Sequence, residues 1–132
     1  MPPRLFTLEE AGEALEEVRP LAEQMVEHRR ALAEAMERQE QLQAQIGGNG
    51  GSLSPADLVE AQEEVEREAG GVAICIERIN RAGAIVKDLD AGLVDFPSLR
   101  DGEEVLLCWR VGEDEIGWWH RPEEGFAGRR PL

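Results

Sequence analysis

The sequence has few of the residues that most often carry chemistry. Its 132 residues include two cysteines, two histidines, three tryptophans and no tyrosine, and Lys87 is the one lysine. Cys75 and Cys108 lie in apolar stretches without a CxxC spacing, so we expect two free, buried thiols in a reducing compartment. The serines lie in predicted turns, with no general base in the local pattern. A nucleophilic triad is therefore not indicated.

Long apolar runs are also missing from the sequence. No stretch approaches the roughly 18 residues that a membrane-spanning helix needs. The first residues, MPPRLFTLEE, lack the apolar region of a secretory signal. We therefore expect a cytoplasmic protein without a membrane partner.

Acidic residues are what the sequence has in excess. It contains 28 Asp and Glu against 14 Lys and Arg, which gives a net charge of −14. This balance argues against nucleic-acid backbones and anionic membranes as partners. We interpret the excess as the solvated faces of helices rather than as an acidic binding function.

Residues 1–83 predict a long helical hairpin. Thr7 and Glu10 form a capping box, and apolar residues then recur at alternating spacings of three and four. Pro20 lies inside this run and should kink the helix or divide it. The glycine-rich segment 47–51 predicts a turn, because it lacks both the preceding strand and the GK[ST] tail of a phosphate loop.

A second helix is predicted from Ser54, its N-cap, and Pro55, its first helical residue. Gly70 and Gly71 lie inside this helix and indicate a close backbone approach or a weak point, and Gly83 suits the residue that follows its end. Two helices joined by a short turn pack antiparallel. The half near the turn is too polar to bury itself, so we expect a homodimer through the hairpin. The alternative is a monomer whose hairpin tip stays in solvent.

Residues 84–132 predict a small antiparallel sheet of about four strands, followed by an irregular tail. Residues 90–92, Asp-Ala-Gly, suit the loop of a first hairpin. In the register that we expect from this loop, Lys87 lies opposite Asp95 as a cross-strand ion pair. Pro97 should end the second strand.

A second hairpin is predicted around a turn at residues 112–115, between a nearly continuous apolar strand and a strand that carries WWH. In the expected register three pairs lie opposite one another: Trp109 with Trp118, Leu107 with His120 and, on the other face, Cys108 with Trp119. We therefore predict an α+β fold in a single domain over residues 1–132, with the helical hairpin packed on the sheet.

Four segments resemble a bacterial family of unknown function, the domain of unknown function 2203. They are FTLEEA near the start, VKDLDAGLVDFP, LLCWRVGEDEIGWWH and the closing GFAGRRPL. The resemblance covers nearly the full length, and the two middle segments are the distinctive ones. It implies a small cytosolic bacterial protein and transfers no catalytic residue.

The candidate residues for a site all lie in the C-terminal part. Converging carboxylates suit a hard metal ion, and a histidine with two carboxylates suits zinc or iron. Structural roles weigh against this, because Asp90 opens a turn and Asp95 has Lys87 as its expected partner. A single histidine is also thin support for a metal centre. The candidates are Asp88, Asp90, Asp95, Trp109, Glu113, His120 and Arg129.

Two functional hypotheses follow, and the sequence does not decide whether the protein is an enzyme. The first is a non-enzymatic interaction or assembly module that acts as a dimer, with a protein partner that the sequence does not identify. In this hypothesis Arg129 and Arg130 bind the acidic helices of a partner subunit, which we favour over a small anion. The alternative is a small metal-binding protein or metal-dependent enzyme with its site in the sheet. A divalent metal is the one cofactor considered, and it is not favoured.

Overall fold

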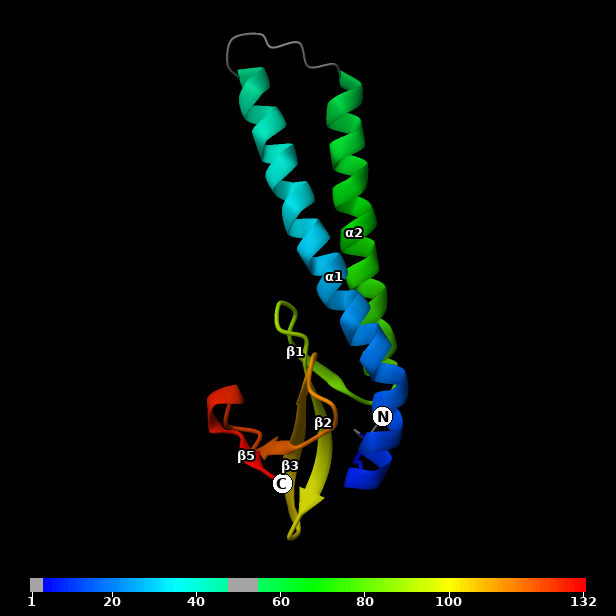
Figure 1. The fold of residues 1–132 in the computed structure, drawn as a ribbon, viewed down its shortest axis with the longest axis vertical. Coiled ribbons are helices and arrows are strands. Elements are labelled where there is room, and N and C mark those ends of the chain that lie inside the picture. Colours follow the sequence, from blue (N-terminus) through cyan, green and yellow to red (C-terminus); the bar gives the residue numbers. More distant parts are fainter. Residues whose placement is uncertain (1–3, 48–54) are drawn as a thin grey trace.

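The computed structural model describes residues 4–47 and 55–132. Two long helices run side by side, and a five-stranded antiparallel sheet packs at the end of the hairpin that holds the N-terminus of the first helix (Figure 1). The α+β prediction is confirmed, with one strand more than expected. The elements are α1 (Leu8–Gly47), α2 (Pro55–Arg81), β1 (Ile85–Asp88), β2 (Leu93–Arg100), β3 (Glu103–Arg110), β4 (Trp118–His120), η1 (Phe126–Gly128) and β5 (Arg130–Pro131).

Helix α1 begins at the predicted capping box. The backbone N–H of Thr7 donates to Glu10 Oε1 at 2.9 Å, and the N–H of Glu10 donates to Thr7 Oγ1 at 3.0 Å. The helix is not divided at Pro20. Val18 and Ala22 are fully buried on either side of the proline, so tertiary packing holds the helical conformation despite the lost backbone donor.

Helix α2 begins at Pro55, whereas Ser54 and residues 48–51 of the expected turn lie outside the described residues. Its end is the predicted glycine cap, because Gly83 has a φ of +99°. The N–H of Gly83 donates to Asn80 O and that of Ala84 donates to Ile79 O, which is the Schellman pattern. Within the described residues, neither helix combines the length and apolar character that a membrane crossing requires.

The register of β1 with β2 differs from the expectation. Val86 pairs with Val94 and Ile85 with Asp95, and the register shifts at Lys87 before Asp88 pairs with Leu93. The expected pairing of Lys87 with Asp95 is therefore wrong. A β-bulge leaves one residue without an opposite partner, and here that residue is Lys87.

Pro97 does not end its strand, because β2 continues to Arg100. The carbonyl oxygen of Pro97 accepts a hydrogen bond from the N–H of Phe6 at 2.7 Å on the edge away from β3. The N and C=O of one strand residue point to the same edge. The backbone N–H that Pro97 lacks would point to the edge facing β1, and β1 pairs with β2 only as far as Asp95. The pairing of β2 with β3 is therefore intact.

The register of β3 with β4 is one residue away from the expectation. Leu106 pairs with His120, Leu107 with Trp119 and Cys108 with Trp118. A slip of one residue moves every side chain of a strand to the opposite face of the sheet. His120 consequently shares a face with Cys108, and Trp119 does not.

The two faces of the sheet have different coverings. The inner face packs against α1 and α2 in the main core, which includes Val94, Phe96, Leu107 and Trp109. The outer face carries the other set of residues. The C-terminal tail lies on the side of the sheet away from the helices (Figure 1), and its strand β5 pairs with β4 at the sheet edge. Asp95, Cys108, Trp118 and His120 belong to this outer set.

The hairpin is packed well near the sheet and thinly toward its far end. Val72, Cys75 and Ile79 of α2 belong to the main core, whereas Ala35 and Ala61 are the buried apolar residues farther along the hairpin within the described chain. Polar pairs join the two helices along their length. His28 Nδ1 lies 2.7 Å from Glu68 Oε2, and Arg38 forms an ion pair with Glu64.

The two adjacent glycines of α2 provide a test of this packing. A Cβ at Gly71 would lie 2.7 Å from ring atoms of His28, whereas a Cβ at Gly70 would meet nothing within 4 Å. We expect Gly71→Ala to lower the free energy of unfolding by about 1–3 kcal/mol because of the clash. Gly70→Ala should raise it by up to about 1 kcal/mol through helix propensity.

Urea denaturation of both variants measures these effects, and Gly70→Ala is the matched control. Shortening His28 to Ala in the Gly71→Ala background should recover part of the loss. Equal effects of the two glycine substitutions would contradict a close approach at Gly71.

Candidate functional site

Three side chains that can bind metal meet on the outer face of the sheet. They are Asp95 from β2, Cys108 from β3 and His120 from β4, and their ligand atoms all lie within 4.8 Å of one another. Asp95 and Cys108 are fully buried and His120 is 3% exposed. Asp95 pairs directly with Cys108, and His120 ends β4 two residues beyond the residue that pairs with Cys108.

Both ring nitrogens of His120 have partners. Nδ1 lies 2.8 Å from the carbonyl oxygen of Arg121, and Nε2 lies 3.0 Å from Asp95 Oδ2. Because a carbonyl oxygen only accepts, Nδ1 carries a proton and donates it. Nε2 therefore faces the carboxylate, with a proton shared between them.

The second carboxylate oxygen of Asp95, Oδ1, is buried without a hydrogen-bond partner of good geometry, which is uncommon in folded proteins. Besides His120, the one side-chain donor among the described residues that acts on this carboxyl is the weak thiol of Cys108. Burial raises the pKa of the Asp95 carboxyl, and the charges of His120 and then Lys87 oppose that rise. The carboxylate is thus held in a place that disfavours its charge.

Cys108 is surrounded by groups of both signs. Burial, followed by the charge of Asp95, raises the pKa of its thiol to about 11, while the guanidinium of Arg129 acts in the opposite direction. Arg129 Nη1 lies 3.9 Å from Cys108 Sγ. A positive group therefore stands beside the sulfur on the side of the tail.

Two arginine–glutamate pairs fix the tail. Arg129 binds both carboxylate oxygens of Glu113, at 3.2 and 3.0 Å, and ties the tail to the turn between β3 and β4. Arg130 binds both oxygens of Glu124, each at 3.0 Å, within the tail itself. Both arginines thus bind carboxylates of their own chain, and their expected contact with the acidic helices of a partner subunit stays a prediction.

Glu113 also connects the tail to the first helix. Its Oε1 accepts the backbone N–H of Arg110, and its carbonyl oxygen accepts from Trp109 Nε1 at 3.0 Å and from Arg19 Nη1 at 2.9 Å. Arg19 also donates to the carbonyl oxygen of Asp114. The turn between β3 and β4 is therefore fixed from the inner face of the sheet.

A pocket of about 410 Å³ lies over Asp95 and His120. Its wall combines the β1–β2 hairpin, with Lys87, Asp88 and Leu93, and the tail, with Glu124, Gly125 and Phe126. The cluster of Asp95, Cys108 and His120, which we call the Asp–Cys–His cluster, is thus buried beneath an opening rather than enclosed on all sides.

The structure separates Trp109 and Asp90 from this cluster and leaves Asp88 and Arg129 beside it. Trp109 is fully buried on the inner face, in the main core. Asp90 pairs with Arg29 of α1 at 3.1 Å, in an exposed position. Asp88 lines the pocket, and its Oδ1 accepts the backbone N–H of Asp90 at 3.1 Å. Whether any of these residues binds a ligand stays a prediction.

The cluster is unsuited to nucleophilic catalysis and suited to a metal ion. A cysteine nucleophile needs a base that takes its proton, and here both nitrogens of His120 are engaged elsewhere. Histidine, thiolate and carboxylate are together the ligand types of zinc and iron. The unpaired Asp95 Oδ1 and the carbonyl that orients Nδ1 are features that such a site uses.

The sequence model of the family described as "Uncharacterized conserved protein (DUF2203)" matches residues 4–132. The chain belongs to this family. No curated protein and no solved structure matches it. The DUF2203 assignment therefore agrees with the resemblance noted in the sequence and adds no ligand, and a function has to be argued from the site itself.

Sequence reasoning missed Cys108 as a member of the site. An apolar strand cysteine indicated inert packing, and the expected register placed it on the face opposite to His120. The signal that could have found it is the alternation of side chains along β3. This alternation places Cys108 on the same face as Leu106 and on the opposite face from Trp109. Glu124 was also missed, since it lies outside the segments that carried the resemblance, and Arg130 was noted only as a basic residue for a partner subunit.

The raised pKa of Cys108 predicts a loss of stability at alkaline pH. A thiol whose pKa is higher in the folded protein stabilises it fully below the unfolded pKa of about 8.5, and this contribution disappears as the pH approaches 11. The loss is about 3 kcal/mol. Because the chain has no tyrosine and one lysine, few other groups titrate in this range.

Urea denaturation of metal-free protein at pH 8 and at pH 11 measures this loss. Cys108→Ala should be less stable than the wild type at pH 8 and should show a smaller decrease between the two pH values. Cys75→Ala removes the other buried thiol, whose pKa burial also raises, and should diminish the decrease by less than Cys108→Ala does. An undiminished decrease in Cys108→Ala would contradict the assignment.

Proposed function

We propose that this DUF2203 protein binds a divalent metal ion of the zinc class through Asp95, Cys108 and His120. The observation that carries the proposal is the burial of all three ligand groups within 4.8 Å of one another. Burying a carboxylate with an unpaired oxygen beside a thiol costs stability unless something compensates. A divalent ion supplies that compensation, since its charge balances one carboxylate and one thiolate.

The spacing of the ligand atoms supports the proposal. Around a tetrahedral zinc ion, nitrogen and oxygen ligands lie about 3.3 Å apart, and sulfur lies about 3.6 Å from each. His120 Nε2 and Asp95 Oδ2 are 3.0 Å apart. This pair therefore needs to open by a few tenths of an ångström to admit the ion, and Cys108 Sγ, which lies within 4.8 Å of both partners, needs to approach by no more than about 1 Å.

The surroundings of the ligands also favour this function. A histidine that ligates through Nε2 commonly donates its Nδ1–H to a carbonyl, as His120 does to Arg121. Arg129 stands beside Cys108 Sγ, where its charge stabilises a thiolate. Glu113 in turn fixes the guanidinium with two hydrogen bonds.

Metal analysis of the purified protein tests the proposal. We expect one zinc or cobalt ion per chain, and we expect cobalt-loaded protein to show a thiolate-to-metal charge-transfer band. Asp95→Asn, Cys108→Ser and His120→Gln should each weaken binding by more than about 100-fold. The charge-transfer band should be absent in Cys108→Ser.

Two substitutions elsewhere serve as matched controls. Cys75→Ser and His28→Gln change the other cysteine and the other histidine, which lie in the helical hairpin, and should leave the metal content unchanged. A protein that stays folded without metal, and whose metal content is no lower in the three ligand variants, would refute the proposal.

As a second, independent proposal, we infer that the protein assembles as a homodimer through the far half of the hairpin. Met36 and Val59 are 51% and 55% exposed there, although apolar side chains of this size favour burial. A second copy would cover them by packing as a four-helix arrangement.

Analytical ultracentrifugation tests the dimer. Met36→Glu combined with Val59→Glu should shift the protein to monomer by at least about tenfold in dissociation constant. Ile74→Glu changes an equally exposed apolar residue (52%) nearer the sheet and should have no such effect. A wild-type chain that sediments as a monomer at high concentration would exclude this arrangement.

A further inference from the structure

The β-bulge at Lys87 gives this residue an unusual direction. Successive side chains of a regular strand point to opposite faces, yet Lys87 and Asp88 both line the pocket over the Asp–Cys–His cluster. The register shift between Val86 and Asp88 makes this possible. Bulges often re-aim a side chain beside a site, and this one brings the single lysine of the chain to the rim of the pocket.

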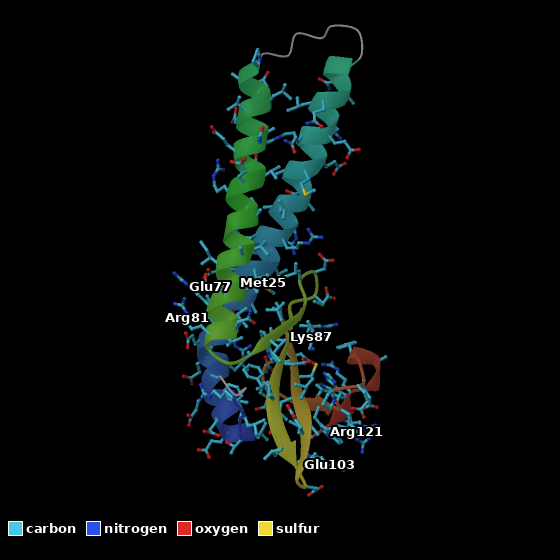
Figure 2. The ribbon with its side chains drawn as sticks, turned by 180° about the vertical axis from the view of Figure 1, so that it is seen from behind. Met25, Glu77, Arg81, Lys87, Glu103 and Arg121 are labelled. Carbon is cyan, nitrogen blue, oxygen red and sulfur yellow. The ribbon has the colours of Figure 1, made fainter. Side chains whose placement is uncertain are left out.

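The ammonium group of Lys87 forms no ion pair among residues 4–47 and 55–132, although its charge acts on the carboxyl of Asp95 in the same pocket wall. Two acidic side chains of that wall do have direct hydrogen-bond partners. Glu124 binds Arg130 with both oxygens, and Asp88 accepts a backbone N–H from Asp90. In Figure 2 Lys87 lies at the end of the sheet nearer the helices, and Arg121 and Glu103 lie toward the other end.

The cluster offers three protein ligands within the described residues. Zinc sites with three protein ligands keep a fourth position for water or another ligand, whereas structural sites are closed by four. Asp95 and His120 form part of the wall of the pocket, and Cys108 does not, so an ion held by these three residues would have its open position toward the pocket. The opposite wall includes the half-exposed ring of Phe126.

We propose that the pocket binds a small organic carboxylate, which takes the fourth position of the metal ion and pairs with Lys87. This inference rests on the proposed metal site. The carboxylate replaces a bound water molecule, so no covalent bond in the protein changes. One ligand oxygen meets the metal, the other accepts from the ammonium of Lys87, and the apolar part of the ligand packs on Phe126.

Titration of the cobalt-loaded, full-length protein with phenylacetate tests the proposal, because a ligand exchange changes the visible spectrum of cobalt. Phenylacetamide has the same shape without the charge and is the ligand control. We expect saturable spectral changes with phenylacetate and at least about tenfold weaker binding of the amide. Acetate should bind more weakly than phenylacetate, because it lacks the ring that packs on Phe126.

Variants of Lys87 separate its role from general electrostatics. Lys87→Ala should weaken phenylacetate binding by at least about tenfold, and Lys87→Arg should recover most of it. Arg78→Ala removes the same charge from an exposed position on α2 and should leave binding unchanged. All three variants should retain one metal ion per chain, since none changes a ligand group.

The outcomes distinguish this inference from the proposed function. A protein that binds no metal refutes both. One metal ion per chain with no spectral response to phenylacetate shows a closed site and overturns the carboxylate inference alone. Equal binding of acid and amide, or unchanged binding in Lys87→Ala, likewise overturns it while leaving the metal site in place.

Discussion

The contact between Asp95 and His120 is the interaction on which the outer face of the sheet depends. Both side chains are buried, and a buried carboxylate is tolerated only where charge or hydrogen bonds compensate for lost water. His120 compensates one oxygen of Asp95, and the other has no well-aligned partner, because the only other side-chain donor to this carboxyl within the described chain is the weak thiol of Cys108. A pair with a purely structural role is expected to satisfy both oxygens, and this difference is why we interpret the pair as part of a site.

The rest of the fold holds that contact from both sides. On the inner face, Arg19 and Trp109 bind the carbonyl oxygen of Glu113, so helix α1 fixes the turn between β3 and β4. On the outer face, the side chain of Glu113 binds Arg129 and keeps the tail over Cys108. One residue of a turn thus links the helical hairpin, the sheet and the tail.

The helices were predictable from the sequence because their signals are local. The capping box of Thr7 and Glu10, the apolar periodicity and the glycine at position 83 each act within one or two turns of helix. The sheet registers were not predictable, because no local sequence signal marks the two places where each register is decided. The bulge at Lys87 shifts β1 against β2, and pairing of Cys108 with Trp118 shifts β4. The candidates Asp95 and His120 were therefore found by residue type, whereas their contact and the role of Cys108 depended on register.

The one-residue shift of β4 also decides what kind of chemistry the sheet can hold. In the expected register His120 would have faced the helices with Leu107, and Cys108 would have lain against Trp119. In the observed register the inner face is left almost wholly apolar and packs on α1 and α2, while the polar and ionisable groups collect beneath the tail. Segregation of this kind places the groups that are costly to bury where a bound ion can offset their cost. The same pairing that completes the core therefore assembles the candidate site on the opposite face.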